Sequence, residues 1–331
     1  MRRFVVIAIA VALVVSACSN NDADTLTVYS GRSEDLIAPL IEQFAEESGF
    51  DVAVRYAGSA EIAATLLEEG ENSPADVVFT QDPASIGSVA LAGLLAPLPA
   101  GLLGFVPEQF SDSDGRWVGI SGRARTVVYD TATLGPEDLP PTEDGLIDPV
   151  WEGDVGIAPA NGSFLAFVAA KILLDGEAAT LSWLEGMAAN DAPSYPNNSS
   201  IVSAVADQQL PSGLVNHYYL LRRLVEQPEA TAANYFFTEP TAGSLVMPSG
   251  AGIMVTSEST EGAEAFIAFL LSEYAQSYFA TQTFEYPLVP GVPADPRLPS
   301  IENIPTPDID LSELASVLDR ATDLVAEAGL L

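Results

Sequence analysis

Residues 26–56, with the sequence LTVYSGRSEDLIAPLIEQFAEESGFDVAVRY, decide the fold of this chain. Residues 26–29 alternate between apolar and polar side chains, which is the pattern of a β-strand. Ser33 is a good N-cap for the helix that follows, and Gly49 is a good residue to end it. Apolar residues recur in between at helical spacing, at Leu36, Ile37, Leu40, Ile41 and Phe44. Because residues 51–56 alternate again, the stretch predicts a strand, a helix and a second strand.

The residues that follow repeat this pattern. Ser59 opens a second helix that ends at Gly70, residues 75–79 form a buried strand, and a further helix runs to Leu95. The alternation predicts an α/β fold with a mostly parallel sheet covered by helices on both faces. Ligands of such sheets bind at the carboxyl ends of the strands, where helix N-termini present their N–H groups. Three loops should meet there, at residues 30–33, 57–60 and 80–85.

A second α/β unit occupies the middle of the chain. Residues 123–129 form a long extended segment, and residues 243–255 form another that would return the chain to the first unit. Two strands crossing between lobes would make a hinge, with a cleft that can close. Helix N-termini are expected at Asn161-Gly162-Ser163 and at Asn197 to Ser200. Residues 213–215 form a strand, so Tyr218 and Tyr219 fall at its carboxyl end.

The N-terminus has the pattern of an export signal. A basic start precedes the apolar residues 4–15, and Val15-Ser16-Ala17-Cys18 resembles a bacterial lipobox in which Cys18 is lipidated. The alternative is an ordinary secretory signal with an incidental cysteine. We therefore expect a signal peptide at residues 1–17, a tether at 18–25, a first lobe from 26–122 and 250–331, and a second lobe from 123–249.

Composition excludes several classes of function. The chain carries 12 basic and 46 acidic residues, a formal net charge of −34, so it has too few cations for ordinary nucleic-acid binding. Five of the cations nevertheless lie beside the motifs of the predicted cleft, namely Arg32, Arg123, Arg125, Arg222 and Arg223. The single cysteine and the single histidine, His217, disfavour zinc or copper. A hydrolase is disfavoured because there is no Gly-x-Ser-x-Gly motif and His217 has no evident nucleophile partner.

The pair Tyr218-Tyr219 is the feature most suggestive of chemistry. Adjacent tyrosines that open an apolar helix are more often packing residues than ligands. A phenol has a pKa of about 10, so it ionises near neutrality only beside a strong positive charge. Phenolate oxygen is a hard donor that suits Fe(III). The position of the pair at a strand's carboxyl end favours a binding role over a packing role.

Five segments in this order resemble those of periplasmic ferric-iron-binding proteins, the solute receptors of ABC iron importers. They are Val-Tyr-Ser-Gly-Arg (28–32), Pro-Ala-Asp-Val-Val-Phe (74–79), Ser-Gly-Arg-Ala-Arg (121–125), Asn-Gly-Ser-Phe-Leu (161–165) and Asn-His-Tyr-Tyr (216–219). The later segments Ser249-Gly250-Ala251 and Glu285-Tyr286-Pro287-Leu288 also fit. The resemblance covers essentially the whole mature chain. It implies a bilobal type II periplasmic-binding-protein fold with two doubly wound lobes.

The resemblance also implies a ligand set. Tyr218 and Tyr219 match the paired phenolate ligands of the family, and Tyr129 matches a third phenolate used by some branches. The chain departs from the best-known site, since Ser33 stands where that site has histidine and Gln81 where it has glutamate. Glu34, Gln81, Asp82 and His217 are the residues left open for completing the shell, although the family counterpart of His217 is usually not a ligand.

A three-tyrosine site of this kind implies a synergistic anion, and it favours carbonate over phosphate. Arg32 and Arg125 are the expected anion partners, because a guanidinium binds oxyanions in a bidentate manner. Further anion or cleft contacts are expected at Ser33, Ser59, Asn161, Gly162 and Asn198.

The expected function is extracytoplasmic capture of Fe(III) and its delivery to an ABC-transporter permease. We expect a monomer without enzymatic activity or nucleic-acid binding, held by its lipid anchor on the outer face of the bacterial cytoplasmic membrane. The alternative is an ABC receptor for a small organic or inorganic anion without iron.

Overall fold

The computed structural model describes residues 25–331. The predicted signal peptide, nearly all of the tether and the predicted lipidation at Cys18 lie outside the described residues. Within residues 25–331, no helix combines the length and the apolar character needed to cross a membrane.

The first lobe begins with the predicted βαβαβ order. Its elements are β1 (Thr25–Ser30), α1 (Glu34–Ser48), β2 (Asp51–Tyr56), α2 (Ser59–Glu69), β3 (Val77–Thr80), α3 (Pro83–Leu91) and the short α4 (Ala100–Leu103). Strand β1 pairs in parallel with both β2 and β3. The predicted start and end of α1 are confirmed, because Ser33 is its N-cap and Gly49 ends it in the left-handed region at φ 79°. All five apolar residues of its predicted stripe are buried.

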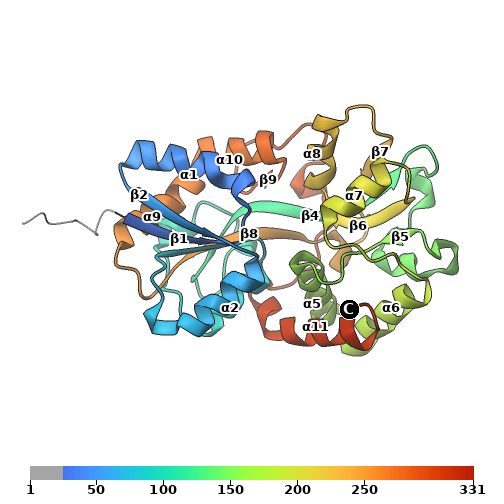
Figure 1. Ribbon diagram of the computed structural model, residues 1–331, viewed down its shortest axis with the longest axis horizontal. Helices are drawn as coiled ribbons and strands as arrows, with labels where there is room; N and C mark the ends of the chain where they lie inside the picture. The colour runs from blue at the N-terminus through green and yellow to red at the C-terminus, as the bar shows by residue number, and fades with distance from the viewer. Residues whose placement is uncertain (1–24) are drawn as a thin grey trace, which may run out of the picture.

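Two long strands connect the lobes, as Figure 1 shows at the centre of the molecule. They are β4 (Val118–Asp130) and β8 (Val246–Ile253), and they pair antiparallel. The main path of the nine-stranded sheet runs in the order β2-β1-β3-β8-β4-β6-β5, and two further strands, β7 and β9, also pair with β4. The predicted hinge of two crossing strands is therefore confirmed. The sheet as a whole is mixed, because a segment that leaves a lobe and one that returns to it run in opposite directions.

The second lobe lies on the other side of this crossing (Figure 1). Its elements are β5 (Val155–Gly156), α5 (Gly162–Asp175), α6 (Glu177–Ala189), α7 (Asn198–Ala206), β6 (Ser212–Asn216), α8 (Tyr218–Glu226) and β7 (Ala232–Tyr235). Strand β6 pairs in parallel with β5 and antiparallel with β4. This pairing places the carboxyl end of β6, and the tyrosines after it, beside the crossing strands.

The C-terminal part of the chain visits both lobes. Its elements are α9 (Thr260–Leu270), α10 (Glu273–Tyr278), β9 (Tyr286–Pro287) and α11 (Leu318–Glu327). Helices α9 and α10 lie near α1, whereas α11 packs beneath α5 and α6 of the second lobe (Figure 1). The Arg320 guanidinium on α11 donates to the Glu177 carboxylate at 2.9 Å. Assigning all of residues 250–331 to the first lobe was therefore wrong, because an amphipathic helix does not reveal which lobe covers its apolar face.

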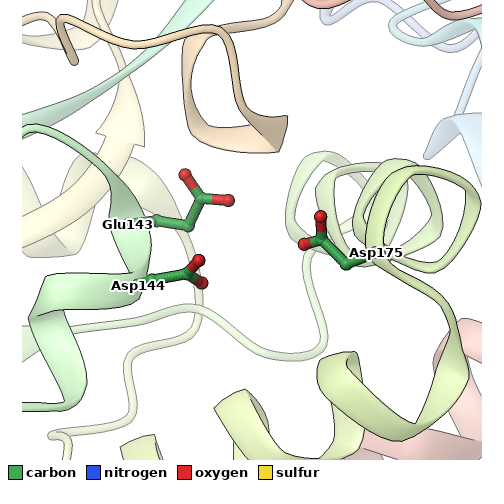
Figure 2. Close-up of side chains that lie close together, drawn as sticks. All are labelled: Glu143, Asp144 and Asp175. Carbon is green, nitrogen blue, oxygen red and sulfur yellow. The ribbon is translucent and has the colours of Figure 1, made fainter.

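A cluster of three carboxylates in the second lobe is bridged by one lysine. Figure 2 shows Glu143, Asp144 and Asp175 facing a common space from two segments. The Lys171 ammonium lies 3.3 Å from Glu143, 2.6 Å from Asp144 and 2.7 Å from Asp175. Glu143 also accepts hydrogen bonds from Thr241 and the Gly243 amide. The ammonium thus takes the place that a metal ion would need, and the cluster is a structural ion network.

This network predicts an asymmetric response to mutation. Lys171→Met should lower the free energy of unfolding by about 3–5 kcal/mol, because it leaves the fully buried Glu143 carboxylate without its cation. Asp144→Asn is the matched control, and its effect should stay below about 1 kcal/mol because Asp144 is 61% exposed. Urea denaturation of both variants measures the difference. Equal losses would contradict this account.

Candidate metal centre between the lobes

The two tyrosines lie at the junction between a strand and a helix. Strand β6 ends at Asn216, His217 is the N-cap of α8, and Tyr218 and Tyr219 form its first turn. Tyr218 is 1% exposed and Tyr219 is half-buried. Their rings stack with centroids 4.1 Å apart and planes 29° apart. Burial raises the pKa of the Tyr218 phenol well above its usual value, so without a bound cation this phenol is neutral.

Three arginines lie near enough to the pair to interact with it electrostatically. Arg32 follows β1, and Arg123 and Arg125 lie two residues apart on β4, so their side chains share one face of that strand. All three are buried, with exposed fractions of 0%, 2% and 4%. Both Arg32 and Arg123 counteract the rise in the pKa of Tyr218, and Tyr219 in turn counteracts the fall in the pKa of Arg125. The arginines and the tyrosines therefore form one electrostatic cluster.

Several nitrogens of these guanidiniums have no hydrogen-bond partner among the described residues. They are Nε and Nη1 of Arg32, Nε and Nη1 of Arg123, and Nη1 of Arg125. A buried N–H group without a partner costs free energy, and the cost is larger when the group is charged. Burial lowers the pKa of Arg125 to about 9 and also lowers that of Arg123. Unsatisfied cationic donors of this kind are suited to an anionic ligand.

One carboxylate partly neutralises this cluster. Glu285, which is fully buried, accepts an ion-paired hydrogen bond from Arg32 and a 2.5 Å hydrogen bond from the Ser121 hydroxyl. Burial alone would raise the pKa of Glu285, but the charges of Arg32 and Arg123 outweigh it and hold the pKa below its usual range. Glu285 is therefore ionised and fixes the direction of the Arg32 side chain.

The predicted helix N-terminus at Asn161 lies beside Arg125. The Arg125 guanidinium donates to the Ser163 carbonyl at 2.5 Å. Asn161 caps α5 by accepting from the Ser163 amide at 3.1 Å, and the Asn198 amide donates to Ser163 Oγ at 3.2 Å. The structure thus brings together Asn161, Asn198 and Arg125. Gly162 faces the other lobe, since a Cβ added there would lie 3.9 Å from Asp82 Oδ2.

The first lobe presents its loops to this cluster from the other side. The Gln81 amide N–H donates to Ser59 Oγ at 2.8 Å, and the Gln81 side chain donates to the Gly31 carbonyl at 2.8 Å. Gly31 permits this close approach, because a Cβ there would lie only 2.3 Å from Ser59 Oγ. Asp82 is buried and caps α3 by accepting from the Ser85 amide at 2.7 Å.

Ser33 and Glu34 lie at the start of α1 and are exposed. The Glu34 carboxylate is near Tyr56, where its charge reinforces the effect of burial in raising the pKa of that phenol. Glu34 thus has other surroundings, which weakens it as a candidate for completing a metal shell. Asp82, by contrast, lies close enough to the cluster for the charge of Arg123 to counteract the rise in its pKa that burial causes.

Tyr129 does not lie with the tyrosine pair, so the prediction of a third phenolate ligand at this position was wrong. In the antiparallel pairing of β4 and β6, Arg125 stands opposite Asn216 and Tyr129 opposite Ser212. Tyr129 is therefore about 13 Å further along the sheet, at the opposite end of β6. Its ring belongs to the main core, and the charged group that acts on its phenol is Glu137.

His217 is a structural residue. Its Nδ1 accepts a hydrogen bond from the Ala124 amide at 3.1 Å, and its Nε2 lies 2.8 Å from the Phe284 carbonyl oxygen, to which it donates. The side chain is fully buried, and burial lowers its pKa to about 4. Both ring nitrogens are engaged, so neither is free to bind a metal.

Arg123 and Glu285 complete the site and were not among the predicted anion-binding residues. Arg123 was noted only as one of the cations near the cleft, and Glu285 only as part of a similar segment. The sequence did hold a clue to Arg123. It lies two residues from Arg125 in a predicted strand, so both side chains should lie on the same face. Glu285 carried no such signal, because its partner Arg32 is 253 residues away.

Comparison with known proteins identifies the family. Residues 72–313 match the family described as bacterial extracellular solute-binding protein. The chain belongs to this family. It is 33% identical to the Fe(3+)-binding periplasmic protein of Serratia marcescens over 309 residues, which cover 92% of this chain and 90% of the relative. It is also 33% identical to the major ferric iron-binding protein of Neisseria meningitidis serogroup B, with coverage of 92% and 93%.

Solved structures agree with this assignment and with the bilobal fold. Iron-bound HitA from Pseudomonas aeruginosa matches with a TM-score of 0.88 and 33% identity, covering 92% of this chain and 99% of that one. A Trichodesmium protein in complex with iron and citrate matches with a TM-score of 0.81 and 27% identity, covering 93% and 100%. The solute-binding protein described here therefore has the type II periplasmic-binding-protein architecture expected from its sequence.

The buried, neutral His217 predicts a pH dependence of stability. Below a pH of about 6.5 the unfolded chain takes up a proton at this imidazole, whereas the folded protein resists protonation until about pH 4. The free energy of unfolding should therefore fall as the pH drops through this window, by up to about 3 kcal/mol from this group.

Urea denaturation at pH 7 and pH 5 measures this effect. Carboxylates also titrate in the window, so His217→Gln is the comparison that isolates the imidazole. The variant should lose less stability between the two pH values than the parent protein does. An identical loss in both proteins would assign the pH dependence to other groups.

Proposed function

We propose that this protein is an extracytoplasmic receptor for Fe(III) that holds the metal with the phenolates of Tyr218 and Tyr219 and a synergistic anion. The observation that carries the proposal is the stacked tyrosine pair beside three buried guanidiniums with unpartnered N–H groups. The names of the relatives, which are ferric iron-binding proteins, support the same metal.

The chemistry of the cluster suits a hard trivalent cation. Arg32 and Arg123 both favour the ionised form of Tyr218, but burial outweighs them in the metal-free protein. Fe(III) supplies the additional positive charge that ionises the phenols. Iron binding should thus release the phenol protons, and binding should weaken as the pH falls.

Closure of the lobes would complete the site. Tyr218 and Tyr219 belong to the second lobe, whereas Arg32 and Gln81 belong to the first. An ion pair already links the two lobes near this point, because the Arg222 guanidinium on α8 lies 2.9 Å from the Asp35 carboxylate on α1. We propose that an ABC permease recognises the closed, loaded receptor, which Cys18 anchors to the membrane.

The arginine cluster also favours a second candidate function, an ABC receptor for a small anion without iron. Buried guanidiniums with unpartnered nitrogens would serve such a ligand directly. The two functions differ in one observable, because only iron bound to phenolate gives a visible charge-transfer band.

Substitution of the tyrosines tests the iron proposal. Tyr218→Phe and Tyr219→Phe should each abolish or shift the charge-transfer band and lower iron affinity by at least about 100-fold, since loss of a mere supporting contact costs 10–100-fold. Tyr129→Phe is the matched control, because it removes a buried phenol at the far end of β6. Elemental analysis and visible spectroscopy give the readout. Undiminished iron in both variants of the pair would refute the proposal.

The interlobe ion pair gives a second prediction. Arg222→Gln should raise the rate of iron release to a chelator up to about fivefold at low salt, since an exposed pair contributes about 0.2–1 kcal/mol. The difference should vanish at about 1 M salt, where exposed charges are screened. Arg297→Gln is the control, because its ion pair with Asp295 lies within one loop. If iron release from Arg222→Gln stayed faster at high salt, the Arg222–Asp35 ion pair would not hold the lobes together by charge attraction.

A further inference from the structure

We infer that Phe284 is a positioning residue of the candidate metal centre, because its ring packs against the start of α8 while its backbone carries Glu285 to Arg32. This inference rests on the proposed function, since it takes Tyr218 and Tyr219 to be the residues that hold the metal. Phe284 was not among the predicted site residues.

The backbone of Phe284 has a conformation that aromatic residues rarely adopt. Its φ is 60° and its ψ is 26°, which lies in the left-handed region. Among the described residues other than glycine, only Asp191 and Gln208 share a positive φ. The region is unfavourable for a bulky residue, because its Cβ lies too close to the following carbonyl oxygen. Strained residues of this kind persist only where surrounding contacts hold them, and they cluster at functional sites.

A π-helical turn leads into this corner from the first lobe. Residues 279–283 continue α10 with the wider hydrogen-bond spacing of a π-helix, which often occurs at functional sites. The first carbonyl of the turn accepts hydrogen bonds from the amides of Phe284 and Glu285. Just before the turn, the Tyr278 hydroxyl donates to the Leu36 carbonyl on α1 at 3.1 Å. The corner is therefore anchored to the first lobe.

The ring of Phe284 reaches the second lobe. It is 9% exposed and forms a small apolar cluster with Tyr218 and Leu221, which belong to the first four residues of α8. This cluster is separate from the two larger cores. Removal of the ring would leave a cavity beside Tyr218, and a cavity of this kind collapses only partly. The ring thus limits the positions that the Tyr218 phenol can take.

The main chain at Phe284 connects two groups of the site. Its carbonyl accepts a hydrogen bond from His217 Nε2 at 2.8 Å, and His217 immediately precedes the tyrosine pair. The next residue, Glu285, accepts from Arg32 and from the Ser121 hydroxyl. A change of φ and ψ at Phe284 would rotate the carbonyl and the Glu285 side chain relative to each other. The left-handed conformation therefore fixes the start of α8 relative to Arg32.

The first test removes the ring from the mature full-length chain. Ferric nitrilotriacetate in bicarbonate buffer loads the protein, EDTA competes for the metal, and visible spectroscopy follows the charge-transfer band. Phe284→Ala should shift the band and release iron about tenfold faster or more, since loss of a supporting contact around a metal site costs about 10–100-fold. Phe284→Leu should restore most of the parental rate, because leucine refills the space beside Tyr218 with an apolar group.

Phe269→Ala is the matched control. Phe269 is also 9% exposed, but its ring belongs to the main core, where its centroid lies 5.6 Å from that of Phe44 on α1. This variant should lose stability to urea and keep the parental band and release rate. A parental band and rate in Phe284→Ala would make Phe284 a packing residue only. Equal changes in the two alanine variants would also overturn the inference, because general loss of stability would then explain both.

Phe284→Gly separates the contribution of the backbone from that of the ring. Glycine adopts the left-handed conformation without strain, so this variant should unfold at a higher urea concentration than Phe284→Ala. It should still release iron faster than the parent, because it also lacks the ring. An unfolding midpoint below that of Phe284→Ala would contradict the strained corner. A parental release rate would contradict the role of the ring, and this outcome can be measured even if Phe284→Ala does not fold.

Amide hydrogen exchange in the metal-free protein distinguishes this inference from the function on which it rests. Exchange in a peptide covering residues 213–224 should be faster in Phe284→Ala than in the parent and unchanged in Phe269→Ala. Absence of a charge-transfer band in the parent would refute the iron proposal, and the exchange rates alone would then decide whether Phe284 holds the start of α8. Unchanged exchange in Phe284→Ala would show that it does not.

Discussion

Burial of three guanidiniums around one carboxylate is the constraint on which the centre of this molecule depends. Arg32, Arg123 and Arg125 are almost completely removed from solvent, and Glu285 is the ionised carboxylate that pairs with one of them. Such a cluster is unfavourable by itself, because the free-energy cost of removing the charges from water exceeds the attraction gained when only some of them are paired. The surrounding lobes must therefore hold it in place. These buried charges lower the stability of the folded protein. Residues of a hydrophobic core raise it, so the cluster resembles a binding site more than a core.

The same cluster connects the candidate metal centre to the hinge. Arg123 and Arg125 lie on β4, and Ser121 of that strand donates to Glu285 just before β9. His217 donates to the Phe284 carbonyl, so the residue that precedes the tyrosine pair is tied to the residue that precedes Glu285. A ligand that engages the guanidiniums thus acts on the strand that joins the lobes. We therefore expect ligand binding and closure of the lobes to be coupled through residues that are adjacent in the chain.

The local elements could be predicted from the sequence, whereas the long-range contacts could not. Ser33 and Gly49 delimit α1 because capping depends on neighbouring residues, and the strand before Tyr218 was equally visible. The predicted ligand role of Tyr129 did not hold for a geometric reason. On a helix, a residue four positions from Arg125 would share its surroundings, but on a strand it lies about 13 Å away. The Arg32–Glu285 pair joins distant parts of the chain, and no periodicity records such a contact. The family resemblance pointed to residues around Tyr218 and Tyr219, and only the register of β4 against β6 shows that Tyr129 lies apart from them.

The contrast between the acidic chain and the cationic cluster limits how the site can recognise an anion. With a formal net charge of −34, the protein repels polyanions at long range, although salt confines this field to about 8 Å at physiological ionic strength. Electrostatic steering therefore cannot bring the anion to the cleft, as it does for many anion-binding proteins. Attraction is felt only between the lobes, close to the buried guanidiniums. Affinity must then come from slow dissociation after closure, because the approach itself is unfavourable. An anion that is already bound to a trivalent cation carries less net negative charge. If the cleft takes up iron together with its anion, the long-range field of this acidic protein therefore opposes the loaded complex less than the free anion.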